Sequence, residues 1–470
     1  MTDFTGITAC DAVSGLKAGD FSAESYLDFL LARCEAHGAL NAFITLDAEG
    51  ARRAARHADA KRATGATLGK LHGLPLALKD NIDTAHLPTS GGTPALRNQR
   101  PGNNAPVAQA LLDAGAVLIG KTNMHELAFG ITTNNAAFGA TRNPYAPDKI
   151  PGGSSGGTGA AVVGGLVPAG LGTDTGGSVR VPAALCGIVG FRPTVGRYPG
   201  TGIVPISHTR DTAGPMARTV GDIVLLDGVL AGRGGDIEPA TLAGLRLGVP
   251  RGYFYENLDP QVGTLAEREL ERLRDLGVVL VETDIPDVGK LNEATSFPVA
   301  LYEVVTDLRA YLRDGGSGLT FEQLVEQVAS PDVSGLLTSL LGDGAMPEPV
   351  YRQALDETRP ALQETYRNYF RSNDLAAVIF PTTPLPTRPI GEDETVTLNG
   401  EQVPTFTTFI RNTDPSSNAG IPGLSLPIGT TEDGLPVGIE LDGPAGRDES
   451  LLAIALAVEA SAPAMPPPRL

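Results

Sequence analysis

The sequence predicts an α/β fold, and three observations lead to this prediction. Apolar runs of strand length, such as residues 73–78, recur along the chain. Between them lie longer segments with the helical spacing of apolar residues, such as residues 27–34. Neither a repeat of fixed period nor a low-complexity linker interrupts the 470 residues. Strands and helices that alternate without a divider indicate a single large α/β domain.

Local signals place the expected elements in order. Ser22 can cap the first helix and Gly38 can end it, and a second helix, rich in Ala and Arg, is expected over residues 47–61. Residues 151–194 alternate between loop, helix, strand and loop. The other expected elements are strands over 73–78, 116–119, 245–249, 278–282 and 376–380, and helices over 107–114, from 219, over 261–276 and through most of 298–366. The Pro-rich tail, 461–470, is expected to be frayed.

Composition and charge exclude several classes of protein. The net charge is −18, which argues against binding nucleic acid or an anionic membrane, because both need a basic surface. Cys10, Cys34 and Cys186 have neither a disulfide pattern nor metal-site spacing, and they indicate a reducing cytoplasm. The N-terminus lacks the basic and apolar segments of a signal peptide. The uncharged stretch 158–173 is glycine-rich and shorter than a membrane span.

Two glycine-bracketed serines are the first candidates for chemistry. Residues 152–157, Gly-Gly-Ser-Ser-Gly-Gly, have the composition of a flexible linker or a phosphate loop. They lead directly into an apolar stretch and lack the Gly-Lys-Ser/Thr ending of a Walker motif, which favours a catalytic role for Ser154. In residues 172–178, glycines precede Ser178 and allow consecutive N–H groups to converge on an oxyanion, although a plain glycine-rich turn has the same composition.

Lys79 is the candidate base. It follows the apolar run 73–78, and burial at the end of such a strand would lower the pKa of a lysine. Accepting a serine proton near neutral pH requires a fall from about 10.4 to about 7, whereas a lone lysine is commonly a surface residue. Together, Lys79, Ser154 and Ser178 can supply a nucleophile and its base, and they indicate acyl transfer through a covalent serine intermediate.

A Ser-His-Asp hydrolase and a metal enzyme are the competing interpretations. Ser155 has the position of the serine in a Gly-x-Ser-x-Gly elbow, but only His208 follows it, without the expected strand and loop context. We therefore expect all six histidines to be structural: His37, His57, His72, His86, His125 and His208. The sequence contains neither an HExxH motif nor a cluster of potential metal ligands, so it gives no indication of a metal site.

These motifs resemble those of the amidase signature family. The resemblance extends over residues 74–452, is densest over 149–197, and includes the 24-residue spacing between Ser154 and Ser178. It implies a single amidase domain with a central mixed β-sheet covered on both faces by helices. Within residues 1–470 we expect an N-terminal helical segment (1–65), the catalytic motifs (66–230), and the rest of the sheet with the substrate-pocket helices (231–470).

The resemblance also implies a role for each residue of the site. Ser178 is the nucleophile and Lys79 is the final base. Ser154 bridges them and is held by a cis peptide bond after Gly153. The other implied roles are an oxyanion hole of the backbone amides of Thr175, Gly176, Gly177 and Ser178, supporting hydrogen bonds from Ser155, Asp174 and Arg180, and an acyl pocket lined by Ala128, Phe129 and Gly130. The family needs neither a metal nor an organic cofactor.

Further segments resemble the branch of the family that contains indoleacetamide and mandelamide hydrolases: residues 123–132, 196–200, 205–211 and 414–420, with 296–302 and 365–370 favouring the indoleacetamide side. This implies a cytoplasmic enzyme that hydrolyses a small primary amide of the aryl-acetamide type to a carboxylate and ammonia. Its partner would be the small-molecule substrate, and homodimers are common in the family. The alternatives are the A subunit of a tRNA-dependent amidotransferase, which the acidic balance disfavours, and a non-catalytic scaffold, which the intact motifs disfavour.

Overall fold

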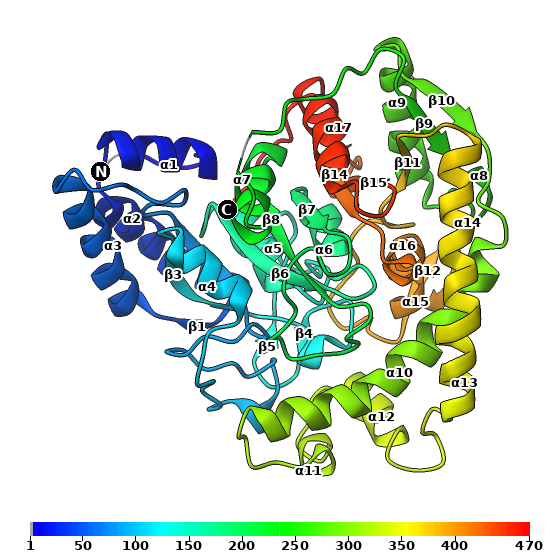
Figure 1. Ribbon diagram of the computed structural model, residues 1–470, viewed down its shortest axis with the longest axis horizontal. Coiled ribbons are helices and arrows are strands. Elements are labelled where there is room, and N and C mark those ends of the chain that lie inside the picture. The colour runs from blue at the N-terminus through cyan, green and yellow to red at the C-terminus, as the bar shows by residue number, and fades with distance from the viewer. Residues whose placement is uncertain (1–2, 235) are drawn as a thin grey trace.

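The computed structural model describes residues 3–234 and 236–470, which form one α/β domain around a central sheet (Figure 1). The sheet has eleven strands in the order β1 (Phe43–Leu46), β3 (Val117–Thr122), β2 (Pro75–Lys79), β6 (Ala169–Asp174), β8 (Thr212–Ala217), β7 (Val189–Arg192), β14 (Gly423–Thr430), β15 (Pro436–Asp442), β11 (Ala377–Pro381), β9 (Arg246–Val249) and β10 (Val279–Glu282). Strand β2 runs parallel to β3 and β6, and β9 runs parallel to β10 and β11. The other neighbours are antiparallel, so the sheet is mixed, as the family resemblance implied.

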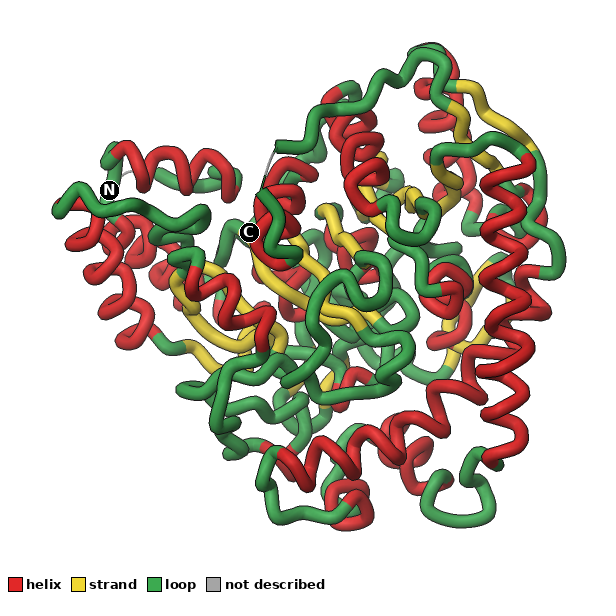
Figure 2. Tube along the Cα trace, in the orientation of Figure 1, coloured by secondary structure: helices red, strands yellow, loops and turns green. Residues whose placement is uncertain are grey.

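Helices flank this sheet, as Figure 2 shows. They are α1 (Ala9–Ala18), α2 (Ala23–Ala36), α3 (Ala48–Ala63), α4 (Pro106–Asp113), α5 (Gly156–Val163), α6 (Arg180–Cys186), α7 (Val220–Leu230), α8 (Arg251–Phe254), α9 (Pro260–Asp275), α10 (Val288–Asp314), α11 (Phe321–Val325), α12 (Pro331–Ser339), α13 (Glu348–Gln353), α14 (Arg359–Ser372), α15 (Thr405–Ile410), α16 (Asp414–Ala419) and α17 (Asp448–Ala460). Two short hairpins, β4 (Asn134–Asn135) with β5 (Gly139–Ala140) and β12 (Thr395–Leu398) with β13 (Glu401–Pro404), lie outside the sheet. The predicted single α/β domain is confirmed. Of the described helices, none is long and apolar enough to cross a membrane.

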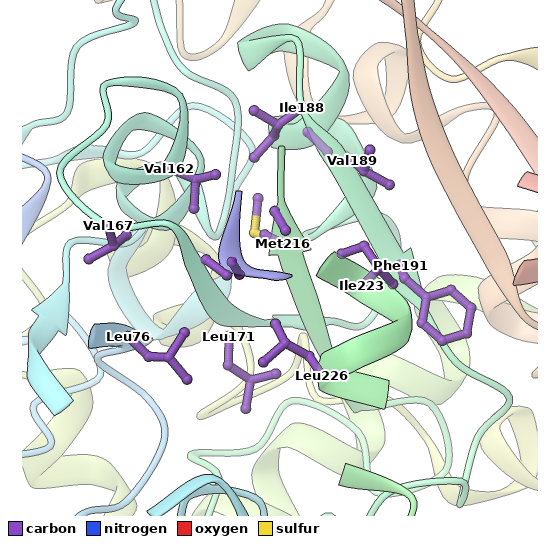
Figure 3. Close-up of a cluster of buried hydrophobic side chains, with 14 of the residues drawn as sticks. Leu76, Val162, Val167, Leu171, Ile188, Val189, Phe191, Met216, Ile223 and Leu226 are labelled. Atoms are coloured by element: carbon purple, nitrogen blue, oxygen red, sulfur yellow. The ribbon is translucent and has the colours of Figure 1, made fainter. Parts of the chain in front are cut away.

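The expected caps and strands are present. The side chains of Ser22, Asp47 and Thr219 accept backbone N–H bonds at the starts of α2, α3 and α7. Figure 3 shows apolar side chains of the central strands, and of the loops just before β6 and β7, packed with those of α5 and α7: Leu76, Val162, Val167, Leu171, Ile188, Val189, Phe191, Met216, Ile223 and Leu226. Close packing of this kind holds the strands in a fixed register. The ends of β2 and β6 are therefore rigid supports.

The helical stretch expected over 298–366 differs from the structure at its start. Its first helix, α10, begins at Val288 and contains Pro298 in its interior. Proline has no N–H, so the carbonyl of Ala294, four residues earlier, loses its helical donor. The hydroxyl of Thr358 lies 3.4 Å from that carbonyl oxygen and 3.1 Å from the carbonyl oxygen of Ala354, and its one proton is shared between them. A tertiary contact thus replaces part of what proline removes, and the helix continues.

Both ends of the chain also depart from the expected description. The N-terminal segment is mainly helical but supplies β1, which pairs antiparallel with β3 as an edge strand of the sheet. The tail, 461–470, has no regular structure, but the Tyr145 hydroxyl donates to the Pro466 carbonyl oxygen at 2.7 Å. The tail is therefore attached to the domain at this point rather than free along its whole length.

Candidate active site

Two parallel strands deliver the candidate base and its neighbours to one edge of the sheet. Lys79 is the last residue of β2, and the pairing of Leu78 with Leu171 places it beside the end of β6. Parallel strands end at the same edge, so Lys79 meets Thr173 there. The Lys79 amine donates to Thr173 Oγ1 at 2.9 Å. The Asn81 amide also donates to Thr173 Oγ1, at 3.0 Å.

The Lys79 amine lies within hydrogen-bond distance of a serine hydroxyl. Its Nζ is 2.7 Å from Ser154 Oγ, and both side chains are fully buried. Burial lowers the pKa of Lys79 to about 7, even though the carboxylates of Asp174 and Asp211 oppose this shift. The value is close to the one that a neutral base near pH 7 requires. The geometry and the desolvation therefore both permit proton transfer between Lys79 and Ser154.

The loop that carries Ser154 is fixed by its backbone. The Gly153–Ser154 peptide bond is cis, as the family resemblance implied. Ser155 then connects this loop to the second serine loop, because its N–H donates to the Ser178 carbonyl oxygen at 3.2 Å. Its hydroxyl bonds both the carbonyl oxygen of Thr173 (3.2 Å) and the N–H of Thr173 (3.3 Å). Ser155 thus ties the end of β6 to both serines.

The carboxylate of Asp174 shapes the glycine-rich loop before Ser178. Its Oδ1 accepts the N–H of Gly177 at 2.9 Å, and its Oδ2 accepts the N–H of Val179 at 3.1 Å. Gly177 has φ +137°, a backbone conformation that L side chains rarely adopt. The Gly177 amide is thus engaged by the loop itself, which differs from its expected place in the oxyanion hole. Among the described residues, the amides of Thr175, Gly176 and Ser178 donate to no protein acceptor.

Two buried guanidinium groups hold Asp174 in place. Arg180 donates to both carboxylate oxygens at 3.0 and 3.1 Å, and Arg192 donates to Oδ1 at 3.1 Å. Burial alone would raise the pKa of Asp174, but Arg180 and Arg192 outweigh it and hold this pKa well below its ordinary value. Arg180 also reaches Ser416 Oγ (2.8 Å) and Ser417 Oγ (2.6 Å). These hydrogen bonds fix the loop that carries Ser178 against helix α16.

Ser178 itself faces a cavity of about 290 Å³. Within the described residues its hydroxyl makes no hydrogen bond. The predicted pocket residues Ala128, Phe129 and Gly130 line the same cavity, as do Thr175 and Gly176. The other lining residues are His125, Ile131, Thr132, Ile206, Arg210, Ser296, Phe297, Ala300, Leu301, Asp332, Leu336, Asp393, Phe406, Ile410 and Asp414. A bound carbonyl group would thus meet the serine and the free amides together.

Sequence reasoning missed the pair that supports the outer side of the loop. Arg210 donates to the Thr175 carbonyl oxygen at 3.1 Å and to Asp414 Oδ1 at 2.5 Å. Asp414 also accepts from Asn292 at 2.9 Å. In the sequence, segments 205–211 and 414–420 show only a likeness to one branch of the family, because a contact across about 200 positions leaves no local pattern.

Among the described residues, side chains that could bind a metal ion lie together at one place: two on α10 and a histidine beside it. One ligand atom each from His208, Glu303 and Asp307 lies within 4.8 Å of the others. The carboxylate of Glu303 is already bound by the hydroxyls of Thr209 (2.9 Å) and Tyr351 (2.9 Å). These hydrogen bonds explain the buried carboxylate without an ion, and the group does not line the cavity of Ser178.

The fold and this site define an amide-hydrolysing enzyme of the α/β class. The chain belongs to the amidase family: the family described as Amidase matches residues 26–452. It is 50% identical over 444 residues to an indoleacetamide hydrolase of Rhizobium radiobacter, covering 94% of each chain. It is 41% identical over 470 residues to a mandelamide hydrolase of Pseudomonas putida, covering 96% of this chain and 91% of that one. The native peptide amidase of Stenotrophomonas maltophilia has a similar structure, with a TM-score of 0.87 at 31% identity over 99% of each chain.

Proposed function

We propose that this protein is a serine amidohydrolase that converts a small aryl-acetamide, such as indole-3-acetamide or a mandelamide-like amide, into a carboxylate and ammonia. The observation that carries the proposal is the buried contact between Lys79 and Ser154 beside the loop that presents Ser178 to a cavity. The names of the relatives at 50% and 41% identity support this substrate class.

The proposed reaction begins with activation of Ser178. Neutral Lys79 takes the hydroxyl proton of Ser154, and Ser154 Oγ takes the proton of Ser178 as Ser178 Oγ attacks the amide carbon. The carbonyl oxygen gains negative charge, which the amides of Thr175, Gly176 and Ser178 stabilise. Fixed donors of this kind are each worth roughly 10²–10³ in rate. The free amides identified above supply them without the help of Gly177.

The second half of the reaction reverses the proton path. The C–N bond breaks, the nitrogen receives the proton back from Lys79 through Ser154, and ammonia leaves an ester on Ser178. A water molecule then attacks the ester carbon and gives its proton to the same relay. The ester C–O bond breaks, the relay returns that proton to Ser178 Oγ, and the carboxylic acid leaves and gives its own proton to the released ammonia in solution. The protons balance over the cycle, and the proposed roles involve no cofactor.

The cavity wall favours an aromatic acyl group. Phe129, Phe297 and Phe406 all line it, and the rings of Phe297 and Phe406 have centroids 6.4 Å apart. These two side chains are unusually exposed for phenylalanine, at 40% and 37%. Exposed aromatic side chains beside a reactive group are typical of a surface that an apolar ligand covers. An aryl ring of the substrate would bury them.

The pH dependence follows from the Lys79 amine. A base accepts a proton only when it is neutral, and the pKa of Lys79 is about 7. We therefore expect kcat/KM to rise as pH rises through about 7 and to level off above it, with about a tenfold fall per pH unit on the acid side. Initial rates of ammonia release between pH 5.5 and about 9.5 measure this profile. An activity that is highest at the acid end would contradict a neutral lysine base.

The amidotransferase alternative is weaker because of the charges in the cavity. Its lining holds three carboxylates, on Asp332, Asp393 and Asp414, and its arginine, Arg210, is already paired with Asp414. Glutamine would bring an α-carboxylate for which this lining offers no unpaired cation. The purified chain alone is expected to release ammonia from indole-3-acetamide, mandelamide or phenylacetamide, and not from glutamine. If the purified chain hydrolysed glutamine but none of the aryl-acetamides, the amidotransferase assignment would be favoured.

Two further expectations from the family resemblance belong to this proposal. A homodimer is the expected assembly, and light scattering of the purified chain measures its mass directly. A cytoplasmic location is the expected compartment, and fractionation of cells that express the protein tests it.

A further inference from the structure

The cavity of Ser178 has a distal end that two carboxylates mark. Asp332 and Asp393 line this cavity and also line an adjoining cavity of about 640 Å³. Ser178, Thr175 and Gly176 line only the first. The two aspartates therefore lie at the junction between the two cavities.

Asp332 is held rigidly at this junction. It lies in the first turn of α12, and its Oδ2 is 2.9 Å from Nε2 of the buried His125. The start of α12 is fixed in turn, because the N–H of Ser330 donates to the buried carboxylate of Glu126 at 2.7 Å and that of Ala329 donates to it at 3.1 Å. His125 and Glu126 belong to the segment that precedes Phe129. The helix and the pocket wall are therefore joined, and the position of the Asp332 carboxylate is set in advance.

The two junction carboxylates differ in what they can still bind. Asp393 accepts from the Thr132 hydroxyl at 2.7 Å through Oδ1 and from the Asn134 amide at 2.6 Å through Oδ2. Asp332 uses Oδ2 for His125, the N–H groups of Val333 and of Asp332 itself lie close enough to the carboxylate to lower its pKa, and no described side chain donates to its Oδ1. Its side chain is 34% exposed. Burial raises the pKa of Asp332, but the hydrogen bond and charge of His125 lower it by more. The pKa of Asp332 therefore lies below its ordinary value.

We propose that Asp332 determines specificity: its free carboxylate oxygen accepts a hydrogen bond from an N–H group on the ring of an aryl-acetamide substrate, as an indole ring would offer. This inference rests on the proposed function and adds to it the residue that selects among aryl-acetamides. Phe297, Phe406 and Leu336 line the same cavity and offer apolar surface to the ring faces. The ring edge would then meet the one junction carboxylate that has an oxygen to spare.

The enzyme would discriminate between rings with and without an N–H group, because leaving Asp332 Oδ1 without a donor costs binding free energy. A ring without an N–H group would displace water from Asp332 Oδ1 and offer no donor in exchange. Sites built to bind a donor reject analogues that lack it more strongly than sites that only measure size. For a hydrogen bond to a charged group, we expect a preference of about 10- to 100-fold in kcat/KM. Indole-3-acetamide and naphthalene-1-acetamide form a suitable pair, because both carry a fused bicyclic ring and only the first has a ring N–H.

The test compares this pair of substrates in three proteins. The wild-type chain is expected to prefer indole-3-acetamide by about 10-fold or more in kcat/KM. Asp332→Ala should lose most of that preference, so that its ratio of kcat/KM for the two amides falls toward one. Glu392→Ala is the matched control, since it removes a carboxylate that lines only the adjoining cavity. It should keep the wild-type ratio. Because each ratio is measured within one protein preparation, partial unfolding of a variant cancels.

Two outcomes would overturn the inference. One is a wild-type enzyme that hydrolyses both amides equally well. The other is an Asp332→Ala variant that loses activity on both in the same proportion, which would indicate a structural role through α12. Failure of the proposed function itself looks different, since the wild-type chain would then hydrolyse neither amide.

Discussion

Replacing Ser178 with alanine is expected to lower kcat by about 10⁴-fold or more. Without this hydroxyl no acyl-enzyme can form, and water would have to attack the amide directly. The substrate cavity and the free amides of Thr175 and Gly176 would remain, so substrate binding should change little. Release of ammonia from a primary aryl-acetamide, followed over hours at high enzyme concentration, measures the residual rate.

The same substitution should leave the fold intact. The Ser178 hydroxyl makes no hydrogen bond to the described residues, so its removal orphans no buried partner. The melting temperature of Ser178→Ala should therefore match that of the wild type. A serine-reactive phosphonate gives an independent measurement: its adduct should map to Ser178 in the wild type and be absent from the variant. Substantial activity in a folded Ser178→Ala variant, or an adduct on Ser154 or Ser155, would exclude Ser178 as the nucleophile.

The sequence predicted those parts of the fold that depend on short-range signals. The caps at Ser22 and Thr219 and the strand that ends at Lys79 are visible as local patterns. The start of α10 was not predicted, because Pro298 is a helix-start signal in isolation. The contact that relieves it, from Thr358, comes from a segment sixty positions further along. Strand β1 was missed for a similar reason, since its partner β3 lies far along the chain.

For the site too, the sequence predicted what depends on neighbouring residues and not what depends on contacts between distant segments. Lys79, Ser154 and Ser178 could be named because each lies in a distinctive local motif. Their meeting point could not be derived, because it depends on the register of β2 against β6. The engagement of the Gly177 amide by Asp174 was not foreseen either, since glycine spacing alone does not show which N–H groups the loop uses for itself. Free donors can be assigned only once every buried hydrogen bond is known.

Replacing Lys79 with methionine is expected to lower kcat/KM by about 10²–10⁴-fold, the usual contribution of a general base. Methionine keeps an unbranched apolar chain in the buried position and removes the amine that contacts Ser154 and Thr173. A buried amine with a pKa lowered to about 7 costs folding free energy near neutral pH, so the variant should be at least as resistant to heat as the wild type. The rise in kcat/KM through about pH 7 should disappear from the residual activity.

Lys121→Met provides a matched control for this result. Lys121 is also fully buried, lies on the neighbouring strand β3, and has a pKa that burial lowers to about 8. Its amine donates to the carbonyl oxygen of Ile82 at 2.6 Å and to Thr89 Oγ1 at 2.9 Å, and it contacts no catalytic serine. Its Nζ also lies 3.8 Å from Asp80 Oδ1, so its loss leaves a buried carboxylate without its cation and should lower stability, while the pH inflection near 7 persists in the folded fraction. A Lys79→Ala variant extends the comparison. A small primary amine in solution can enter the space left by the side chain. It should restore activity only at pH values where that amine is neutral. If Lys79→Met kept the inflection, or if Lys121→Met removed it, the base would have to be sought elsewhere than at the end of β2.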